Sequence, residues 1–129
     1  MSLRWRELVK TLPPIDDEKI ERFLRESRML AQLQHPSIIP VYDVGVSDQF
    51  GAFAGMRPAR HGTLDEVVQA RRSGDSAMNE QWPLSRRLEV IARVCDGVAY
   101  AHSRGVVHLD IKPPNILLGE FGEALLGDW

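Results

Sequence analysis

The sequence predicts an α+β fold in which strands and helices occupy separate stretches of the chain. In order along the chain, the segments are predicted as a strand, a helix, two strands, two helices and then short strands. Crossover helices do not alternate regularly with these strands, as a doubly wound parallel sheet would require. The 129 residues are enough for one modest domain with one core.

Composition excludes several classes of protein. A net charge of −2 gives no reason to expect a nucleic acid or an anionic membrane as partner. The single cysteine, Cys95, excludes an intrachain disulfide and a cysteine-rich metal site, and it favours a reducing, cytoplasmic compartment. No apolar run approaches the roughly 18 residues that span a bilayer, so we expect no membrane contact from this segment.

The first predicted elements are a strand and an amphipathic helix. Residues 5–12 alternate weakly in polarity before two prolines, which predicts a short strand. Asp16 or Asp17 can cap a helix over residues 17–34. Its apolar positions recur at helical spacing: Ile20, Phe23, Leu24, Leu30 and Leu33.

The middle of the chain predicts a hairpin, a short helix and a loop. Residues 38–46 and 50–57 are typical of two strands joined in a hairpin. Thr63 and Glu66 have capping-box spacing, which predicts a helix that runs to about Arg72. Residues 73–82 are polar and contain glycine and serine, so we expect a loop there.

A long helix and two short strands are expected in the remainder. Ser85 can cap a helix that continues to about Arg104, where Gly105 is a suitable stop. The expected apolar stripe of this helix is Leu88, Ile91, Val94, Cys95 and Val98. Residues 116–118 and 124–126 are predicted as strands on either side of a turn.

The residues with the clearest chemical pattern lie between positions 108 and 128. Asp110 and Asn115 are five residues apart with Lys112 between them, and Asp128 follows the last predicted strand. Phosphoryl transfer from ATP needs a carboxylate for the attacking hydroxyl, oxygen ligands for Mg²⁺ and a cation beside the migrating phosphoryl group. These four side chains can supply all three.

The run His108-Leu109-Asp110-Ile111-Lys112-Pro113-Pro114-Asn115, followed by Asp128 at the end of a strand, resembles the protein-kinase catalytic loop and its metal-binding motif. The preceding stretch, residues 100–107, resembles the same family. The resemblance is to eukaryotic-type (Hanks-type) serine/threonine kinases of the bacterial kind. It implies that Asp110 is the catalytic base, that Lys112 neutralises phosphate charge, and that Asn115 and Asp128 bind Mg²⁺, with Mn²⁺ as an alternative. His108, His102 and His35 are expected to be structural.

Further upstream, the resemblance implies ATP-binding residues. Glu26 matches the glutamate of the family's regulatory helix, and Lys10 is the candidate for the lysine that anchors the phosphates. Both residues could instead be ordinary solvated side chains. Met56 would lie at the back of the adenine pocket, and the backbone groups of Arg57 and Ala59 would bond adenine.

The chain departs from the family pattern at several points. Leu109 replaces an arginine that normally pairs with phosphate on the activation loop, so we do not expect that form of control. Trp129 stands where the family has phenylalanine, and no glycine-rich loop precedes Lys10. We therefore expect residues 1–129 to be a partial kinase domain, with the end of the N-lobe at about 4–59 and the first part of the C-lobe at about 60–129. An incomplete fold leaves apolar surface and strand edges open, so we expect self-association.

Three functions are compatible with this pattern. The leading one is ATP-dependent phosphorylation of serine or threonine in protein substrates, as the family activity, with this chain inactive by itself. The second is a non-catalytic kinase-like binding or structural module. The third is a small-molecule kinase of the aminoglycoside or choline type, in which a different residue usually stands at the position of Lys112.

Overall fold

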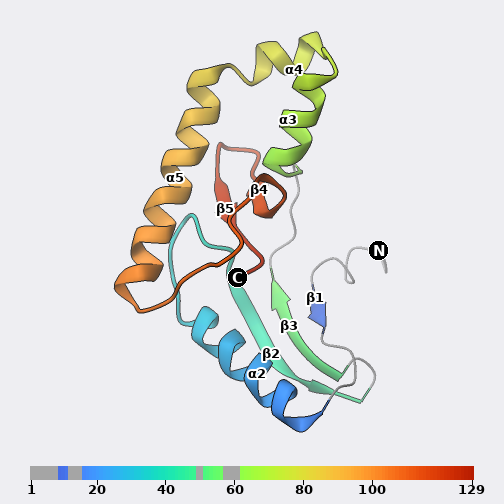
Figure 1. Cartoon of the computed structure of the whole chain (residues 1–129), viewed down its shortest axis with the longest axis vertical. Helices are drawn as coiled ribbons and strands as arrows, with labels where there is room; N and C mark the ends of the chain where they lie inside the picture. The colour runs from blue at the N-terminus through green and yellow to red at the C-terminus, as the bar shows by residue number, and fades with distance from the viewer. Residues whose placement is uncertain (1–8, 12–15, 49–50, 57–61) are drawn as a thin grey trace. The chain divides into compact units, whose positions relative to one another are not determined.

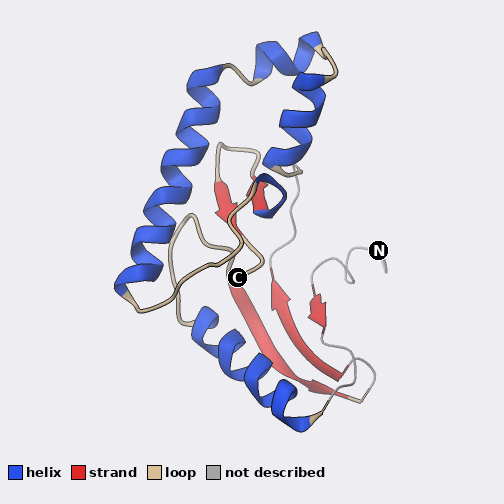
Figure 2. Ribbon diagram, viewed as in Figure 1, coloured by secondary structure: helices blue, strands red, loops and turns tan. Residues whose placement is uncertain are grey.

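The computed structural model describes residues 9–11, 16–48, 51–56 and 62–129, and the chain forms two compact units (Figure 1). Unit 1 comprises Met1–Gln34 and Ile39–Pro58, and unit 2 comprises His35–Ile38 and Ala59–Trp129. Figure 2 shows that each unit contains both helix and strand. The predicted α+β class is confirmed.

Within its described residues, unit 1 contains a three-stranded antiparallel sheet and one helix. The strand order is β1 (Val9–Thr11), β3 (Gly51–Met56) and β2 (Val41–Ser47), so the predicted hairpin between the second and third strands is present. Helix α2 (Asp17–Ala31) contacts β2 and β3. The Asp16 carboxylate caps α2 by accepting a hydrogen bond of 2.9 Å from the backbone N–H of Lys19.

Three boundaries in this region differ from the predictions. Helix α2 ends at Ala31, three residues before the predicted end. The strand expected at 38–46 begins only at Val41, because Pro40 lacks an N–H and Ile38 pairs with Leu126 of unit 2 instead. Of the strand expected at 5–12, Val9–Thr11 is a strand and the remainder lies outside the described residues.

Unit 2 places a small hairpin among helices. The hairpin consists of β4 (Ile116–Leu118) and β5 (Ala124–Leu126), and it lies between α3 (Leu64–Arg72) and α5 (Leu84–Ser103) in Figure 1. Thr63 caps α3 through the N–H of Glu66, as predicted. The core joins these elements through buried apolar side chains: Leu64, Val67, Trp82, Val90, Val94, Ile116, Leu118, Ala124 and Leu126.

The prediction of a loop at residues 73–82 is wrong, because α4 (Ser76–Gln81) forms there. The Asp75 carboxylate accepts a hydrogen bond of 3.0 Å from the N–H of Met78 and so caps this short helix. Trp82, which is buried, follows at its end, and Arg71 Nη1 donates to the Trp82 carbonyl at 3.0 Å. A local cap and one buried aromatic therefore outweigh the glycine and serine content of the segment.

Helix α5 also differs from its prediction. It begins at Leu84 after Pro83, so Ser85 is not its cap. Its buried face comprises Val90, Val94, Gly97 and Ala101. Of the predicted stripe, Val94 is buried and Val98 partly buried, whereas Leu88, Ile91 and Cys95 are exposed.

Gly97 explains why this face of α5 is buried. A Cβ atom at position 97 would lie 3.1 Å from the Ser37 carbonyl oxygen and 3.4 Å from Ile38 Cγ1. The absence of a side chain thus allows residues 35–38 to pass close to the helix backbone. In the part of the chain that the structure describes, no helix combines the length and the apolar character needed to cross a membrane.

Candidate active site

The candidate site is built on the segment that follows α5. Gly105, with φ of +77°, lets the chain leave the helix, and Val106 N–H bonds to the Ala101 carbonyl at 2.9 Å. The chain then passes through His108 and Asp110 to a 3₁₀ turn, η1 (Pro113–Asn115), which leads directly into β4. The segment is therefore fixed at both ends by regular structure.

His108 is the most buried side chain of this segment, with 2% of its surface exposed. Its Nδ1 accepts the backbone N–H of Asp110 at 3.0 Å, and its Nε2 lies 2.7 Å from the carbonyl oxygen of Gly127. Because Nδ1 is an acceptor, the ring proton must be on Nε2, which donates to Gly127. His108 is therefore a neutral imidazole that joins two backbone segments, as its expected structural role requires.

Four hydrogen bonds form a closed ring around the site. Two are those of His108, to Asp110 N–H and to the Gly127 carbonyl. Asn115 Nδ2 donates to the Asp110 carbonyl at 2.8 Å, and Gly127 N–H donates to the Asn115 carbonyl at 2.8 Å. This ring, which we call the 108–110–115–127 ring, fixes the segment that carries Asp110 against the residue that precedes Asp128.

The Asp110 carboxylate has two side-chain partners. Lys112 Nζ lies 3.2 Å from its Oδ2, and Asn115 Nδ2 lies 3.3 Å from the same oxygen. The hydrogen bond from Lys112, with smaller contributions from the charge of Lys112 and the bond from Asn115, lowers the pKa of Asp110 below its ordinary 3.8, while desolvation opposes this. Asp110 is consequently ionised at neutral pH, and about half of its side chain remains exposed to receive a ligand.

Asn115 and Asp128 are the two predicted metal ligands. Asn115 donates both of its hydrogen bonds to Asp110 through Nδ2, so its amide oxygen is the atom able to bind a cation. Asp128 is exposed and immediately follows Gly127, which is bonded to Asn115. Mg²⁺ typically takes one or two protein oxygens and completes its shell with water and substrate phosphates, so this donor set fits it. Within the described residues, no cluster of three or more His, Cys, Asp or Glu forms a separate metal site.

Three candidate ATP-binding residues lie on strands or the helix of unit 1. Lys10 is paired with Ala54 in the β1–β3 register, and Met56 follows two residues later, so positions 10 and 56 share a face of the sheet. Glu26 lies on α2, is exposed, and forms an ion pair of 3.0 Å with Arg22. Arg57 and Ala59 lie outside the described residues.

Two contributors to the site were not predicted as such. Gly127 supplies a carbonyl and an N–H to the ring, and only the backbone conformation could identify it. Trp129, noted in the sequence merely as a departure from phenylalanine, donates its indole N–H to the Leu126 carbonyl at 3.0 Å. The sequence could have indicated this contact, because a tryptophan adjoins a candidate metal ligand and its indole N–H usually finds a hydrogen-bond partner when buried.

Comparisons with known proteins agree with one another. Residues 8–129 match the family model of the protein kinase domain. The chain is 37% identical over 113 residues to serine/threonine-protein kinase PknD of Protochlamydia amoebophila, which covers 84% of this chain and 11% of that protein. The proteins of the same name from Chlamydia caviae and Chlamydia pneumoniae are each 36% identical, over 88% and 84% of this chain and 13% and 12% of their own lengths. The chain thus spans only about an eighth of these curated relatives.

The ring can be tested by removing its imidazole. His108→Ala leaves the buried Gly127 carbonyl and the partly buried Asp110 N–H without their partner, so we expect the free energy of unfolding to fall by about 2–4 kcal/mol. Urea denaturation followed by circular dichroism measures this. The matched control is His102→Ala, on the exposed surface of α5, which should change stability by less than about 0.5 kcal/mol. Equal effects of the two substitutions would contradict the ring's importance.

The pKa of Asp110 provides a second test. In Lys112→Gln the largest cause of the lowered pKa is removed, so the pKa of Asp110 should rise toward its ordinary value. The measurement is an NMR pH titration of the Asp110 carboxyl carbon, with Lys19→Gln on α2 as control.

The lowered pKa of Asp110 determines how the stability of the fold depends on pH. Because the folded-state pKa is lowered, the interaction stabilises the fold above the unfolded-state pKa and is lost as the pH falls through the folded-state value. Any stability difference between the unsubstituted chain and Lys112→Gln should therefore disappear in acid. An Asp110 titration that is unaffected by Lys112→Gln would show that the ion pair does not form in solution.

Proposed function

The chain belongs to the protein kinase domain family, and from this premise we propose that it supplies the catalytic loop for transfer of the γ-phosphoryl group of ATP to serine or threonine of protein substrates. The observation that carries the proposal is the contact of Lys112 and Asn115 with one carboxylate oxygen of Asp110. Serine/threonine phosphorylation is the activity named for the family's relatives, and its assignment to the longer protein that contains this chain is part of the proposal.

Asp110 would orient the substrate hydroxyl and accept its proton as the hydroxyl oxygen attacks the γ-phosphorus. The bond from that phosphorus to the bridging oxygen breaks, and ADP leaves. A carboxylate with a lowered pKa is a weak base, but little proton transfer is needed early in a loose transition state, so positioning is its larger contribution. The 108–110–115–127 ring supports this role because it fixes the backbone on both sides of the Asp110 side chain.

Three residues would balance the negative charge of the phosphates: Lys112, Asn115 and Asp128. The Lys112 ammonium lies 3.2 Å from Asp110, so it can stabilise the phosphoryl group that approaches the same carboxylate. Asn115 and Asp128 would hold Mg²⁺ or Mn²⁺, which neutralises charge on the phosphates when bound. Lys10 and Glu26 would anchor the phosphates, and Met56 and the backbone of Arg57 and Ala59 would contact adenine.

The proposal extends to organisation and location. We propose that residues of about 4–59 and 60–129 are the end of an N-lobe and the beginning of a C-lobe, and the division of the chain into two compact units near position 58 supports this. A cytoplasmic location is supported by Cys95, which is a free thiol.

One observation favours the alternative of a kinase-like module without turnover. The Glu26 carboxylate pairs with Arg22 on its own helix, whereas phosphate anchoring would need it for Lys10. Calorimetric titration of the chain with Mg-ATP tests the ATP-binding part of the catalytic function. If the chain does not bind ATP at millimolar concentration, this segment has a structural role only.

Catalysis is tested in the longer protein. We expect Asp110→Asn to reduce phosphate transfer to a serine- or threonine-containing protein by at least about a hundredfold, since it removes the proton acceptor while keeping the size of the side chain. Asp96→Asn, at an exposed position of α5, is the control and should transfer phosphate normally. Transfer that survives Asp110→Asn would refute the catalytic assignment.

Self-association of the isolated chain is the last part of the proposal. Leu84, Leu88, Ile91 and Cys95 are exposed and follow one another by four, three and four residues, so they form one apolar stripe on α5. A second copy of the chain can cover this stripe with its own.

Analytical ultracentrifugation at micromolar concentration should show a mass above that of the monomer. The Leu88→Gln/Ile91→Gln double variant should shift the mass toward the monomer, and Glu89→Gln, off the stripe, should not. A monomeric mass for the unsubstituted chain would contradict the proposed self-association.

A further inference from the structure

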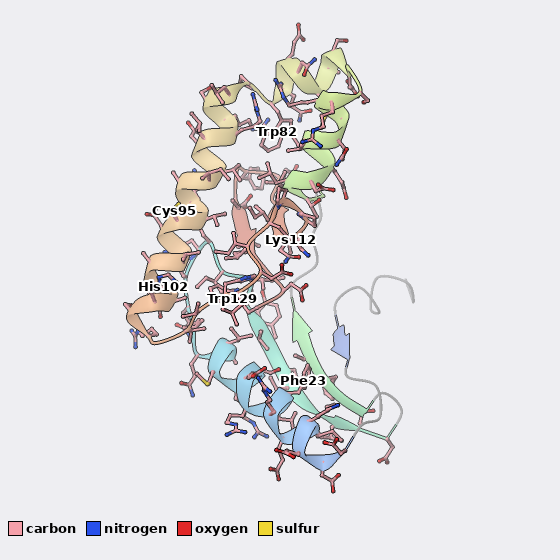
Figure 3. All side chains as sticks on the ribbon, in the orientation of Figure 1. Phe23, Trp82, Cys95, His102, Lys112 and Trp129 are labelled. Atoms are coloured by element: carbon pink, nitrogen blue, oxygen red, sulfur yellow. The ribbon has the colours of Figure 1, made fainter. Side chains whose placement is uncertain are left out.

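The apolar stripe of α5 is exposed along its length. Its three large aliphatic side chains keep about half of their surface in contact with solvent: Leu84 59%, Leu88 57% and Ile91 43%. Spacings of three and four residues place such side chains on one side of a helix, where a second helix can pack against them. In Figure 3, Trp82 lies just before the stripe begins and Cys95 marks its end. The stripe therefore occupies the N-terminal part of α5.

Arg87 borders this stripe on the side of the core. It comes three residues after Leu84 and four before Ile91, so it is a neighbour of both on the helix surface. Three residues further along, Val90 belongs to the buried face of α5. The Nε atom of Arg87 is itself buried, and it has no hydrogen-bond partner among the described residues.

Two other partly buried arginines of unit 2 do have partners. Arg71 Nη1 donates to the Trp82 carbonyl at 3.0 Å. Arg86 Nη1 donates to the Gln81 carbonyl at 2.8 Å, and its guanidinium lies over the Trp82 ring, 3.8 Å from the centroid. Arg87 is the exception, because its buried donor has lost water without gaining a protein acceptor. A charged group in this condition costs free energy until an acceptor reaches it.

The surroundings of Arg87 favour a carboxylate as that acceptor. The first turn of α5 contains no acidic residue and no side-chain cap, so nothing in that turn compensates the positive end of the helix dipole. Helix α3 contributes two further cations in its last turn, Arg71 and Arg72. Glu89 is the nearest carboxylate along α5, but a separation of two residues places it about 200° around the helix from Arg87. The stripe itself contains no acidic residue.

We propose that the stripe and Arg87 form a docking surface for an amphipathic helix of a partner protein, which covers the stripe with apolar side chains and presents a glutamate or aspartate to Arg87. Apolar burial would supply most of the affinity, and the charge pair would supply the selectivity. A second copy of the chain can cover the apolar residues, but its own stripe brings no carboxylate to Arg87. This surface goes beyond the proposed phosphoryl transfer and does not depend on it.

The experiment uses a synthetic amphipathic helix of about 15 residues, the length at which an isolated helix becomes marginally stable. Its leucines are spaced three and four residues apart, and one glutamate borders them. A second peptide has glutamine in place of that glutamate. Both are titrated with the 129-residue chain, and binding is followed by fluorescence anisotropy. We expect the glutamate peptide to bind about tenfold more tightly, as for one hydrogen bond between charged groups.

Substitutions in the chain assign this preference to Arg87. Arg87→Met removes the charge and keeps an apolar stem, so the two peptides should bind equally well. Arg87→Glu should favour a third peptide that has lysine in place of the glutamate. Arg93→Met is the control, because Arg93 is exposed and lies two residues beyond Ile91, on the other side of α5. It should keep the tenfold preference.

A urea titration separates loss of docking from loss of folding. Because Arg87 Nε has no partner among the described residues, Arg87→Met should leave the urea midpoint of the unbound chain unchanged or raise it. A lower midpoint would show that Arg87 already has a partner in the chain, which contradicts the premise.

The binding results decide the rest. Equal affinities of the glutamate and glutamine peptides for the unsubstituted chain would overturn the role of Arg87, as would a glutamate preference that survives Arg87→Met. If neither peptide binds, the docking surface is refuted, and self-association of the chain in the same solution would identify a second copy as the occupant of the stripe. Phosphate transfer is not measured, so the outcome is independent of the proposed function.

Discussion

The hydrogen bonds of one buried imidazole organise the candidate site. His108 accepts from Asp110 N–H and donates to the Gly127 carbonyl, so a single ring joins two segments that are 17 residues apart in sequence. A cation at this position would present a donor to the Asp110 N–H and lose that bond, so the neutral form is built into the arrangement. Asn115 completes the ring by bonding both segments, and hydrogen bonds that are closed in this way strengthen one another in a protein interior.

The ring in turn depends on the register of the hairpin. Ile116 pairs with Leu126, and these residues immediately adjoin Asn115 and Gly127, the two ring members that bond each other. A slip by one residue would send the buried side chains of β4 and β5 to the opposite face and would separate Asn115 from Gly127. Because Ile116, Leu118 and Leu126 belong to the apolar core, hydrophobic burial fixes the position of polar groups that contribute little to the core themselves.

The sequence was most informative where spacing alone determines geometry. The positions of Asp110, Lys112 and Asn115 within six residues sufficed to predict that they share a site, and capping residues located α3 correctly. The buried face of the long helix was harder to predict, because α5 carries two apolar stripes and the local pattern cannot tell which one faces the core. The close approach of residues 35–38 that Gly97 allows determines which face is buried. The register of Lys10 with Ala54 likewise depends on pairing between distant strands, which no single segment encodes.

Leu109 shows how the ring limits the consequence of a substitution. The His108 ring must point inward and the Asp110 N–H must return to that same ring, so the residue between them is forced to a φ of +23° with its side chain 95% exposed. The positive φ disfavours β-branched residues at position 109, but the loop does not depend on packing of this side chain, because it is almost entirely exposed. Leucine in place of the family's arginine removes a partner for an external phosphate while the hydrogen bonds that hold Asp110 remain intact. The departure thus concerns how the site would be regulated, and the groups proposed for the chemistry are held independently of it.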